Sequence, residues 1–233
     1  MTGLETGTPT APPRLFGRRR SRKTLRVPLD MRPFVIVLLG GIASGKSRVA
    51  ALFAERGAVV LAADPIVHEL LETAPVQARI TELFGPGIVV DGAVDRAALA
   101  ARVFADEAEL RRLEELLHPL VRERMTAELE ALEGEDDRRP VALLDIPLAA
   151  ETGWLEQADL TVFVDTDETL RHERSKARGG WTPEHHRARE AKQMPVAEKR
   201  ALADAIVPNN HSVTEAGDHV RRIWIERVEP RLS

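Results

Sequence analysis

The sequence contains a short segment whose residue types suit the binding of a phosphate chain. Gly40 is followed after four residues by Gly45, Lys46 and Ser47, which is the pattern of a phosphate-binding loop. Glycines let the backbone curl so that successive N–H groups face phosphate oxygens, and a following helix adds its positive end. Lys46 would place a cation at the β- and γ-phosphates, and the Ser47 hydroxyl would be a ligand for Mg²⁺. The residues predicted to contact the nucleotide here are Gly41, Ile42, Ala43, Ser44, Gly45, Lys46, Ser47 and Arg48.

Because this pattern also occurs by chance, the residues around it decide its meaning. The continuous apolar run at 34–39 is typical of a strand buried on both faces. Residues 47–56 carry apolar side chains at helical spacing, and a second strand is expected at 58–64. A glycine-rich loop between a buried strand and a helix predicts a nucleoside triphosphate site.

A triphosphate site does not by itself name an activity. A GTPase should carry an Asn-Lys-x-Asp segment that reads the base, and this sequence has none. A small-molecule kinase needs a carboxylate beside the acceptor hydroxyl. Asp64 and Asp145 each end a predicted strand, where side chains face the ligand crevice of such a sheet. Either can orient a hydroxyl or hold Mg²⁺, although Asp145 is equally well explained as the cap of a following helix.

A kinase also needs cationic groups that cover the transferred phosphoryl group. Arg171, Arg174 and Arg178 are spaced to share one face of a predicted helix, and glycines follow them. Such a face is suited to a mobile lid that clamps phosphoryl oxygens. The alternative is an ordinary solvated helix whose arginines pair with nearby glutamates.

The remaining pattern predicts an α/β fold in which helices flank a five-stranded parallel sheet. Residues 66–132 are predicted to be mostly helical, with a break at His118-Pro119 because proline disfavours helix in the residue before it. His118 alone would be read as a structural cap at that joint. A helix is expected to restart at Thr182-Pro183. The last three strands are expected at 141–145, 160–165 and 205–207.

Composition excludes several classes of protein. The 233 residues include no cysteine, so disulfides, thiolate metal sites and cysteine nucleophiles are absent. The net charge is −4, but residues 1–33 carry eight basic and two acidic side chains, a charge of +6, which leaves −10 for the rest. No apolar run approaches the roughly 20 residues of a membrane span. We therefore expect a cytoplasmic protein without a membrane partner.

The basic segment at 1–33 is predicted to be a disordered extension, because it is rich in Thr, Pro and Gly and lacks apolar periodicity. The simplest interpretation is an incidental extension, and the alternatives are a targeting segment or a nucleic-acid-binding arm. The acidic remainder and an aromatic content of 4% argue against a nucleic-acid partner.

Beyond the phosphate-binding loop, the sequence resembles the dephospho-CoA kinase family over residues 34 to about 225. The His-Pro pair and the Ala-Asp and Asn-Asn ending, in this order, are more specific than the loop itself. The resemblance is carried by "GGIASGKS" (40–47), "AAD" (62–64), "FGPGIVVDGAVDRAAL" (84–99), "LLHPLVR" (116–122), "DIPLAAE" (145–151), "VFVD" (162–165), Gln193, Lys199, "AD" (203–204) and "NN" (209–210).

The resemblance implies transfer of the γ-phosphoryl group of ATP, with Mg²⁺, to the 3′-hydroxyl of dephospho-CoA, the last step of coenzyme A synthesis. It implies catalytic roles for Lys46 and Asp64, with Asp64 also at the metal and the acceptor. The other roles that it implies are lid contacts by Arg174 and Arg178, acceptor contacts by His118, Pro147 and Leu148, and adenine contacts by Asn209 and Asn210.

The resemblance also implies one kinase domain at 34–233, in which a core is interrupted by a helical substrate-binding insertion and a lid. The expected core is 34–65, 140–165 and 205–233, the insertion 66–139 and the lid 166–204. The sequence departs from the family at Ala62, where an acid is usual, at Pro65, and at Ala149, where the family has a leucine. We expect a monomer or a weak homo-oligomer. The alternatives are another P-loop small-molecule or nucleoside monophosphate kinase, and an ATP-binding module that contacts nucleic acid.

Overall fold

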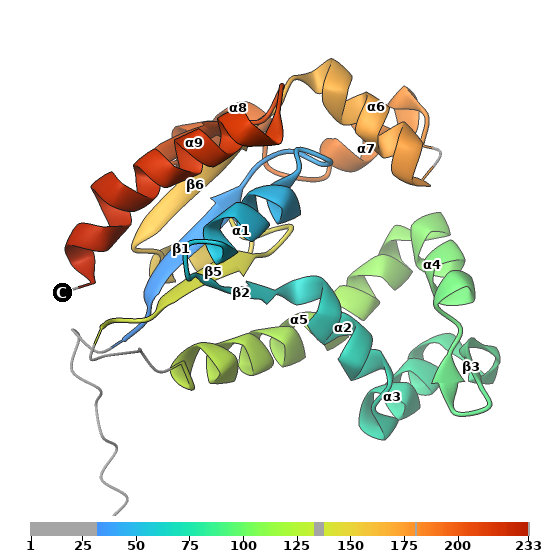
Figure 1. The fold of residues 1–233 in the computed structure, drawn as a ribbon. Coiled ribbons are helices and arrows are strands. Elements are labelled where there is room, and N and C mark those ends of the chain that lie inside the picture. Colours follow the sequence, from blue (N-terminus) through green and yellow to red (C-terminus); the bar gives the residue numbers. More distant parts are fainter. Residues whose placement is uncertain (1–31, 133–137, 180, 233) are drawn as a thin grey trace, which may run out of the picture.

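The structure, a computed structural model, describes residues 32–132, 138–179 and 181–232. The predicted extension at 1–33 therefore lies almost wholly outside the described residues. Five parallel strands form one sheet in the order β2-β5-β1-β6-β7, which confirms the predicted α/β fold and its five-stranded parallel sheet (Figure 1). The strands are β1 (Phe34–Leu39), β2 (Val59–Ala62), β5 (Val141–Asp145), β6 (Leu160–Asp165) and β7 (Ala205–Pro208).

The central strand β1 pairs with β5 on one side and β6 on the other. All six of its residues are buried, because helices cover both faces of the sheet. Phe34, Ile36 and Leu38 point to one face, and the residues between them point to the other. This double burial explains why the strand is a continuous apolar run instead of an alternating one.

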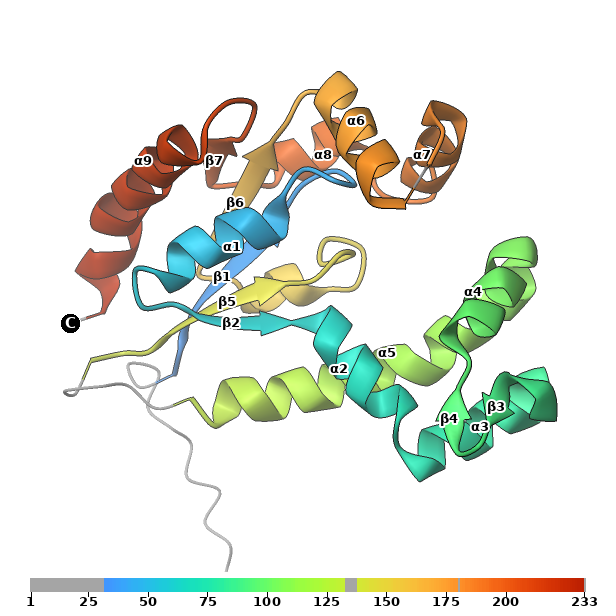
Figure 2. The same ribbon diagram turned by 45° about the vertical axis from the view of Figure 1, so that its right-hand side comes forward.

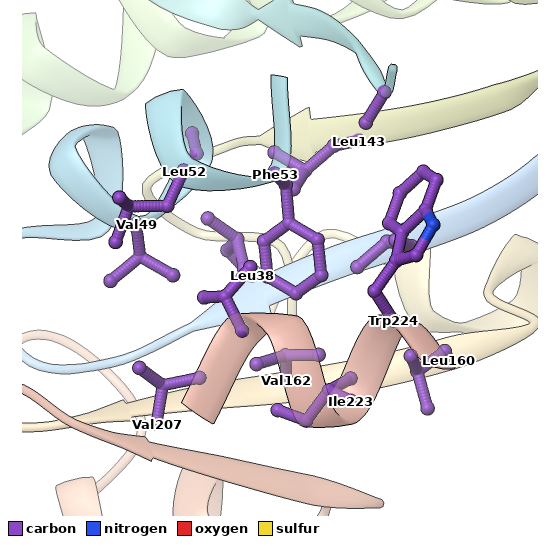
Figure 3. Close-up of a cluster of buried hydrophobic side chains, with 14 of the residues drawn as sticks. Leu38, Val49, Leu52, Phe53, Leu143, Leu160, Val162, Val207, Ile223 and Trp224 are labelled. Atoms are coloured by element: carbon purple, nitrogen blue, oxygen red, sulfur yellow. The ribbon is translucent and has the colours of Figure 1, made fainter. Parts of the chain in front are cut away.

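One face of the sheet is covered by α1 (Lys46–Ala54) and α9 (Val213–Ile223). Phe53 of α1 lies between Leu38 and Trp224, with its ring centroid 6.5 Å from that of the indole (Figure 3). Trp224 begins a short π-helix, Trp224–Val228, that continues α9 and is followed by a 3₁₀ turn, Glu229–Arg231. The opposite face packs against the long helix α5 (Glu107–Glu130) through Val121, Met125 and Leu129.

A helical insertion between β2 and β5 has a core of its own and lies to one side of the sheet (Figure 2). A two-stranded hairpin joins its halves, and its turn residues Asp91 and Gly92 have φ values of 51° and 75°. Asp and Gly are favoured in such turns because they tolerate positive φ. The insertion consists of α2 (Ala63–Leu71), α3 (Ala74–Phe84), a 3₁₀ turn (Pro86–Ile88), β3 (Val89–Val90), β4 (Ala93–Val94), α4 (Arg96–Ala105) and α5.

Three helices connect β6 to β7: the first two lie beyond the carboxyl ends of the strands, and the third packs alongside β6 (Figure 1). Thr182 caps the second of them, since its hydroxyl accepts a hydrogen bond from the His185 N–H at 3.3 Å, as the Thr182-Pro183 pair predicts. Gly180, part of the predicted break, lies outside the described residues. These helices are α6 (Glu168–Gly179), α7 (Pro183–Glu190) and α8 (Val196–Ala201), and a 3₁₀ turn (Trp154–Gln157) precedes β6.

Two local expectations were wrong. The second strand stops at Ala62, so Asp64 lies in the first turn of α2 and not at a strand end. Helix α5 continues through Pro119, so His118 lies inside a helix and not at a joint. Proline removes one backbone hydrogen bond, but Pro119 and Glu115, whose carbonyl loses its partner, are exposed to solvent. Water can therefore satisfy that carbonyl while the other side of the helix packs on the sheet.

We predict that Asp159 holds the first described residues onto the core. Its carboxylate accepts hydrogen bonds from Arg32, Arg139 and the buried Val35 N–H, all at 2.9 Å or less. Asp159→Ala should lower the free energy of unfolding by about 2 kcal/mol, because it leaves the buried Val35 N–H without its acceptor and removes the anion that two guanidiniums share. Asp218→Ala, at an exposed position of α9, is the matched control in denaturant unfolding. Equal stability of the two variants would contradict this role.

Candidate active site

The phosphate-binding loop lies between the end of β1 and the first turn of α1. Gly45 has φ 89°, in the left-handed region, and a side chain there would collide with the amide of Asn209. Ala43 also has a positive φ, 58°. The loop thus turns back on itself and leads directly into the first turn of α1. The backbone N–H groups at the amino end of this helix are suited to bind phosphate oxygens.

Lys46, the first residue of α1, lies among charged groups of both signs. Burial lowers the pKa of Lys46, and the nearby Lys199 lowers it further, while Asp145 and Asp64 act in the opposite direction. A triphosphate would supply the negative charge that favours the ammonium form. The loop residues therefore fit the nucleotide that the sequence predicts.

The main hydrogen-bonded anchor of the loop is the carbonyl oxygen of Ser44. Three donors reach this oxygen: Thr166 Oγ1 at 2.8 Å, Asn209 Nδ2 at 2.7 Å and Arg174 Nη1 at 3.1 Å. Arg174 also donates through Nη2 to the Asn209 carbonyl at 2.9 Å. In this structure Arg174 and Asn209 thus act on the loop, and any contact with a phosphoryl group or an adenine stays a prediction.

Arg171 braces the loop at a second point. It is buried, donates through Nε to the Thr166 carbonyl at 3.2 Å, and forms an ion pair with Glu190 of α7. A side-chain carbon at Gly41 would lie 2.6 Å from Arg171 Nη1 and 2.9 Å from Glu190 Oε1, so this ion pair packs directly against the backbone of the loop. Glu190 therefore offsets the positive charge of Arg171, which lies one helical turn before Arg174 on α6. Arg178 lies in the last turn of α6, and its side chain is outside the described part of the chain.

Asn210 lies beside the loop anchor but faces away from it. Its Oδ1 accepts from the Asp167 N–H at 2.8 Å, and its Nδ2 donates to the Asp167 carboxylate at 3.1 Å. These two hydrogen bonds join the segment after β7 to the segment before α6.

The residues predicted to bind the acceptor come together in one pocket of about 440 Å³. Asp64 enters from the first turn of α2, His118 from the middle of α5, and Pro147 and Leu148 from the segment after β5. The floor is apolar and includes Leu117, Val121, Ile146 and Trp154. The pocket lies on the β2-β5 side of the sheet, where Ala62 is the register partner of Asp145.

The partners of the buried Lys199, whose charge acts on Lys46 of the loop, were not predicted from the sequence. Lys199 is 2% exposed, and its ammonium lies 2.8 Å from the Glu151 carboxylate and 3.0 Å from Gln193 Oε1. The same Glu151 oxygen accepts from the Met194 N–H at 2.9 Å. Gln193 and Lys199 entered only through the family resemblance, and no local pattern points to Glu151, which is 48 residues away from Lys199 in the sequence.

Comparison with known proteins identifies the family. The dephospho-CoA kinase family model matches residues 34–215. A dephospho-CoA kinase of Symbiobacterium thermophilum is 43% identical over 192 residues, which cover 82% of this chain and 80% of that protein. The chain belongs to the dephospho-CoA kinase family.

Solved structures support the same family fold. A crystal structure of a Thermus thermophilus protein is 36% identical, with a TM-score of 0.71, and the match covers 84% of this chain and 98% of that one. The dephospho-CoA kinase of Campylobacter jejuni shares the fold at 23% identity and a TM-score of 0.59, over 83% of this chain and 97% of that one. The part of the chain that the structure describes contains no helix long and apolar enough to cross a membrane.

We predict that Arg174→Ala weakens nucleotide binding as well as turnover. The substitution removes hydrogen bonds to two carbonyls, of Ser44 and Asn209, that shape the loop. The dissociation constant for ADP should rise about tenfold, the equivalent of one charge-assisted hydrogen bond. Arg174→Lys should recover part of the loss, since an ammonium cannot reach both carbonyls in the fork geometry. Lys176→Ala, at an exposed position of α6, is the control. An unchanged ADP affinity in Arg174→Ala would show that the loop does not need this brace.

We also predict that Phe104 restrains α7. Arg189 of α7 has its guanidinium carbon 3.9 Å from the centre of the Phe104 ring and 4.1 Å from that of Trp181. Phe104 belongs to α4, so this contact joins the insertion to the helices that follow β6. Phe104→Ala should remove about 1 kcal/mol of cation–π attraction and speed hydrogen exchange of the α7 amides. Val90→Ala, at another exposed apolar position of the insertion, should leave that exchange unchanged. Equal exchange in both variants would refute the restraint.

Proposed function

We propose that this chain is a dephospho-CoA kinase that transfers the γ-phosphoryl group of ATP to the 3′-hydroxyl of dephospho-CoA, giving coenzyme A and ADP. The observation that carries the proposal is the pocket containing Asp64, which is formed by segments that follow β2 and β5. Strand β5 is the neighbour of β1, whose carboxyl end leads into the phosphate-binding loop. The carboxylate of Asp64 also raises the pKa of Lys46, against the larger effect of burial, so its charge influences the loop lysine. Membership of the family names the acceptor.

Asp64 is suited to orient the acceptor hydroxyl. It is exposed to the pocket, and no side chain in the described residues forms an ion pair with it. A carboxylate in this state can accept a hydrogen bond from the ribose hydroxyl and take up its proton as the oxygen attacks. The new bond joins the 3′-oxygen to the γ-phosphorus, and the bond from that phosphorus to the oxygen bridging it to the β-phosphorus breaks. ADP leaves with the bonding electrons.

Lys46 is suited to stabilise the charge that develops on the phosphoryl oxygens. Burial lowers the pKa of Lys46, and the negative charge of a bound phosphate chain would favour the ammonium form at the site where it is needed.

Mg²⁺ would be held by the Ser47 hydroxyl and by Asp64, together with phosphate oxygens and water. The described residues contain no group of three or more His, Asp or Glu side chains that would hold a metal without a ligand. This donor set fits Mg²⁺, which usually binds through one or two protein oxygens and the substrate phosphates. When bound, the ion would neutralise negative charge on the β- and γ-phosphates.

Release of ADP in a coupled assay tests the proposed acceptor. Dephospho-CoA should accelerate ADP release strongly, whereas AMP, shikimate and gluconate should not, and the product should carry its new phosphate on the 3′-oxygen. Rapid ADP release that is independent of dephospho-CoA would contradict the proposal.

Two substitutions should separate donor binding from acceptor activation. Lys46→Ala should weaken ATP binding and lower turnover, because the lysine contacts the nucleotide throughout the reaction. Asp64→Asn should retain ATP affinity and lower turnover about 10²- to 10⁴-fold, the range for loss of a general base. Calorimetric titration with ADP and steady-state rates give both quantities. An Asp64→Asn enzyme within threefold of the wild-type rate would move the role to Asp145.

A further inference from the structure

One wall of the acceptor pocket carries a guanidinium, on the exposed residue Arg122, that is held at two points. The guanidinium carbon of Arg122, on α5, lies 4.8 Å from the centre of the Trp154 ring, and its Nη2 donates to the Thr152 carbonyl. Trp154 is only 4% exposed, so its ring is a rigid platform within the core. Stacking on an aromatic ring combined with one hydrogen bond restricts the rotation of the guanidinium plane.

The charge around Arg122 shows what kind of group would bind there. Among the described residues that line the pocket, Arg122 is the only lysine or arginine, and Asp64 and Glu114 are acidic. No carboxylate forms an ion pair with Arg122 in the part of the chain that the structure describes. The guanidinium of Arg122 would offset the repulsion that both acids exert on an anionic ligand. The pocket can therefore accept an anion at one place, the free edge of this guanidinium.

We propose that Arg122 binds the 5′-diphosphate of the acceptor and thereby positions its ribose for phosphorylation. This inference rests on the proposed function. The acceptor hydroxyl and the 5′-diphosphate of dephospho-CoA belong to the same nucleotide and are separated only by the ribose ring and one methylene group. With the hydroxyl at Asp64, the diphosphate is close enough to reach Arg122, which lines the same pocket. A guanidinium can bind phosphate oxygens through two parallel hydrogen bonds, which fixes direction as well as distance.

The acceptor could instead place its adenine ring on the guanidinium, since arginine also stacks on aromatic rings. These two binding modes predict different effects of an Arg122 substitution on a ligand that lacks the diphosphate. If Arg122 holds the diphosphate, the residue should matter for dephospho-CoA and not for adenosine, which has the same base and ribose. If Arg122 holds the adenine, both ligands should lose affinity equally.

The experiment compares wild type, Arg122→Met, Arg122→Lys and a control, Arg124→Met. Arg124 lies two residues away on α5, pairs with Glu128 on the surface and is not part of the pocket. Methionine keeps an unbranched apolar stem over Trp154 and removes the charge. Steady-state rates give KM for dephospho-CoA and for ATP. Calorimetry gives the affinities for dephospho-CoA and adenosine while a non-hydrolysable ATP analogue saturates the donor site.

Arg122→Met should raise KM for dephospho-CoA about 10- to 100-fold, the range for lost hydrogen bonds to a charged group, and leave KM for ATP unchanged. Its adenosine affinity should equal that of wild type, and Arg122→Lys should fall between the two. Arg124→Met should behave as wild type. A KM for dephospho-CoA within twofold of wild type in Arg122→Met, or an equal loss of adenosine affinity, would overturn the inference.

Thermal unfolding of each variant separates this role from packing on Trp154. If Arg122→Met does not fold, Arg122→Lys, which keeps both stem and charge, must still show a raised KM for dephospho-CoA at wild-type stability. A wild-type KM in that variant overturns the inference. An inactive wild-type enzyme with dephospho-CoA would instead overturn the proposed function.

Discussion

The carbonyl oxygen of Ser44 is the point on which the site depends. A glycine-rich loop has many accessible conformations, so it can surround a phosphate chain only if the rest of the protein selects one of them. Here three donors from three separate segments converge on one loop carbonyl: Thr166 after β6, Arg174 in α6 and Asn209 after β7. The loop is thus shaped by groups that lie outside it, and its interior stays available for phosphate.

The order of the strands explains how the donor and acceptor sites meet. The loop follows the central strand β1, and its anchors come from the β6-β7 side of the sheet. The acceptor pocket comes from the other side, since Asp64 follows β2 and Pro147 follows β5. Ligands of α/β sheets bind beyond the carboxyl ends of the strands, where the chain turns to opposite sides of a central strand. Lys46 lies at that point, influenced by Asp145, Lys199 and Asp64 together.

Local sequence was sufficient for features whose residues are adjacent in the chain. The glycine pattern, the five apolar strands and the cap at Thr182 each depend on a few consecutive residues. The start of α2 and the continuity of α5 through Pro119 were not predictable in this way, because tertiary packing outweighed the local preference. Contacts between distant segments were also hidden, such as Arg171 with Glu190, Lys199 with Glu151, and Arg122 with Trp154.

Triphosphate binding by Asn209→Leu tests the role of the Ser44 anchor most directly. Leucine has a similar volume but donates no hydrogen bond, and Asn210→Leu is the matched control because its side chain bonds to Asp167 instead. The affinity for inorganic tripolyphosphate, which has no adenine, should fall about tenfold in Asn209→Leu, the equivalent of one hydrogen bond, and remain at the wild-type value in Asn210→Leu. If Asn209→Leu binds tripolyphosphate as tightly as wild type and loses affinity only for ATP, Asn209 recognises the adenine and the loop is not held in this way.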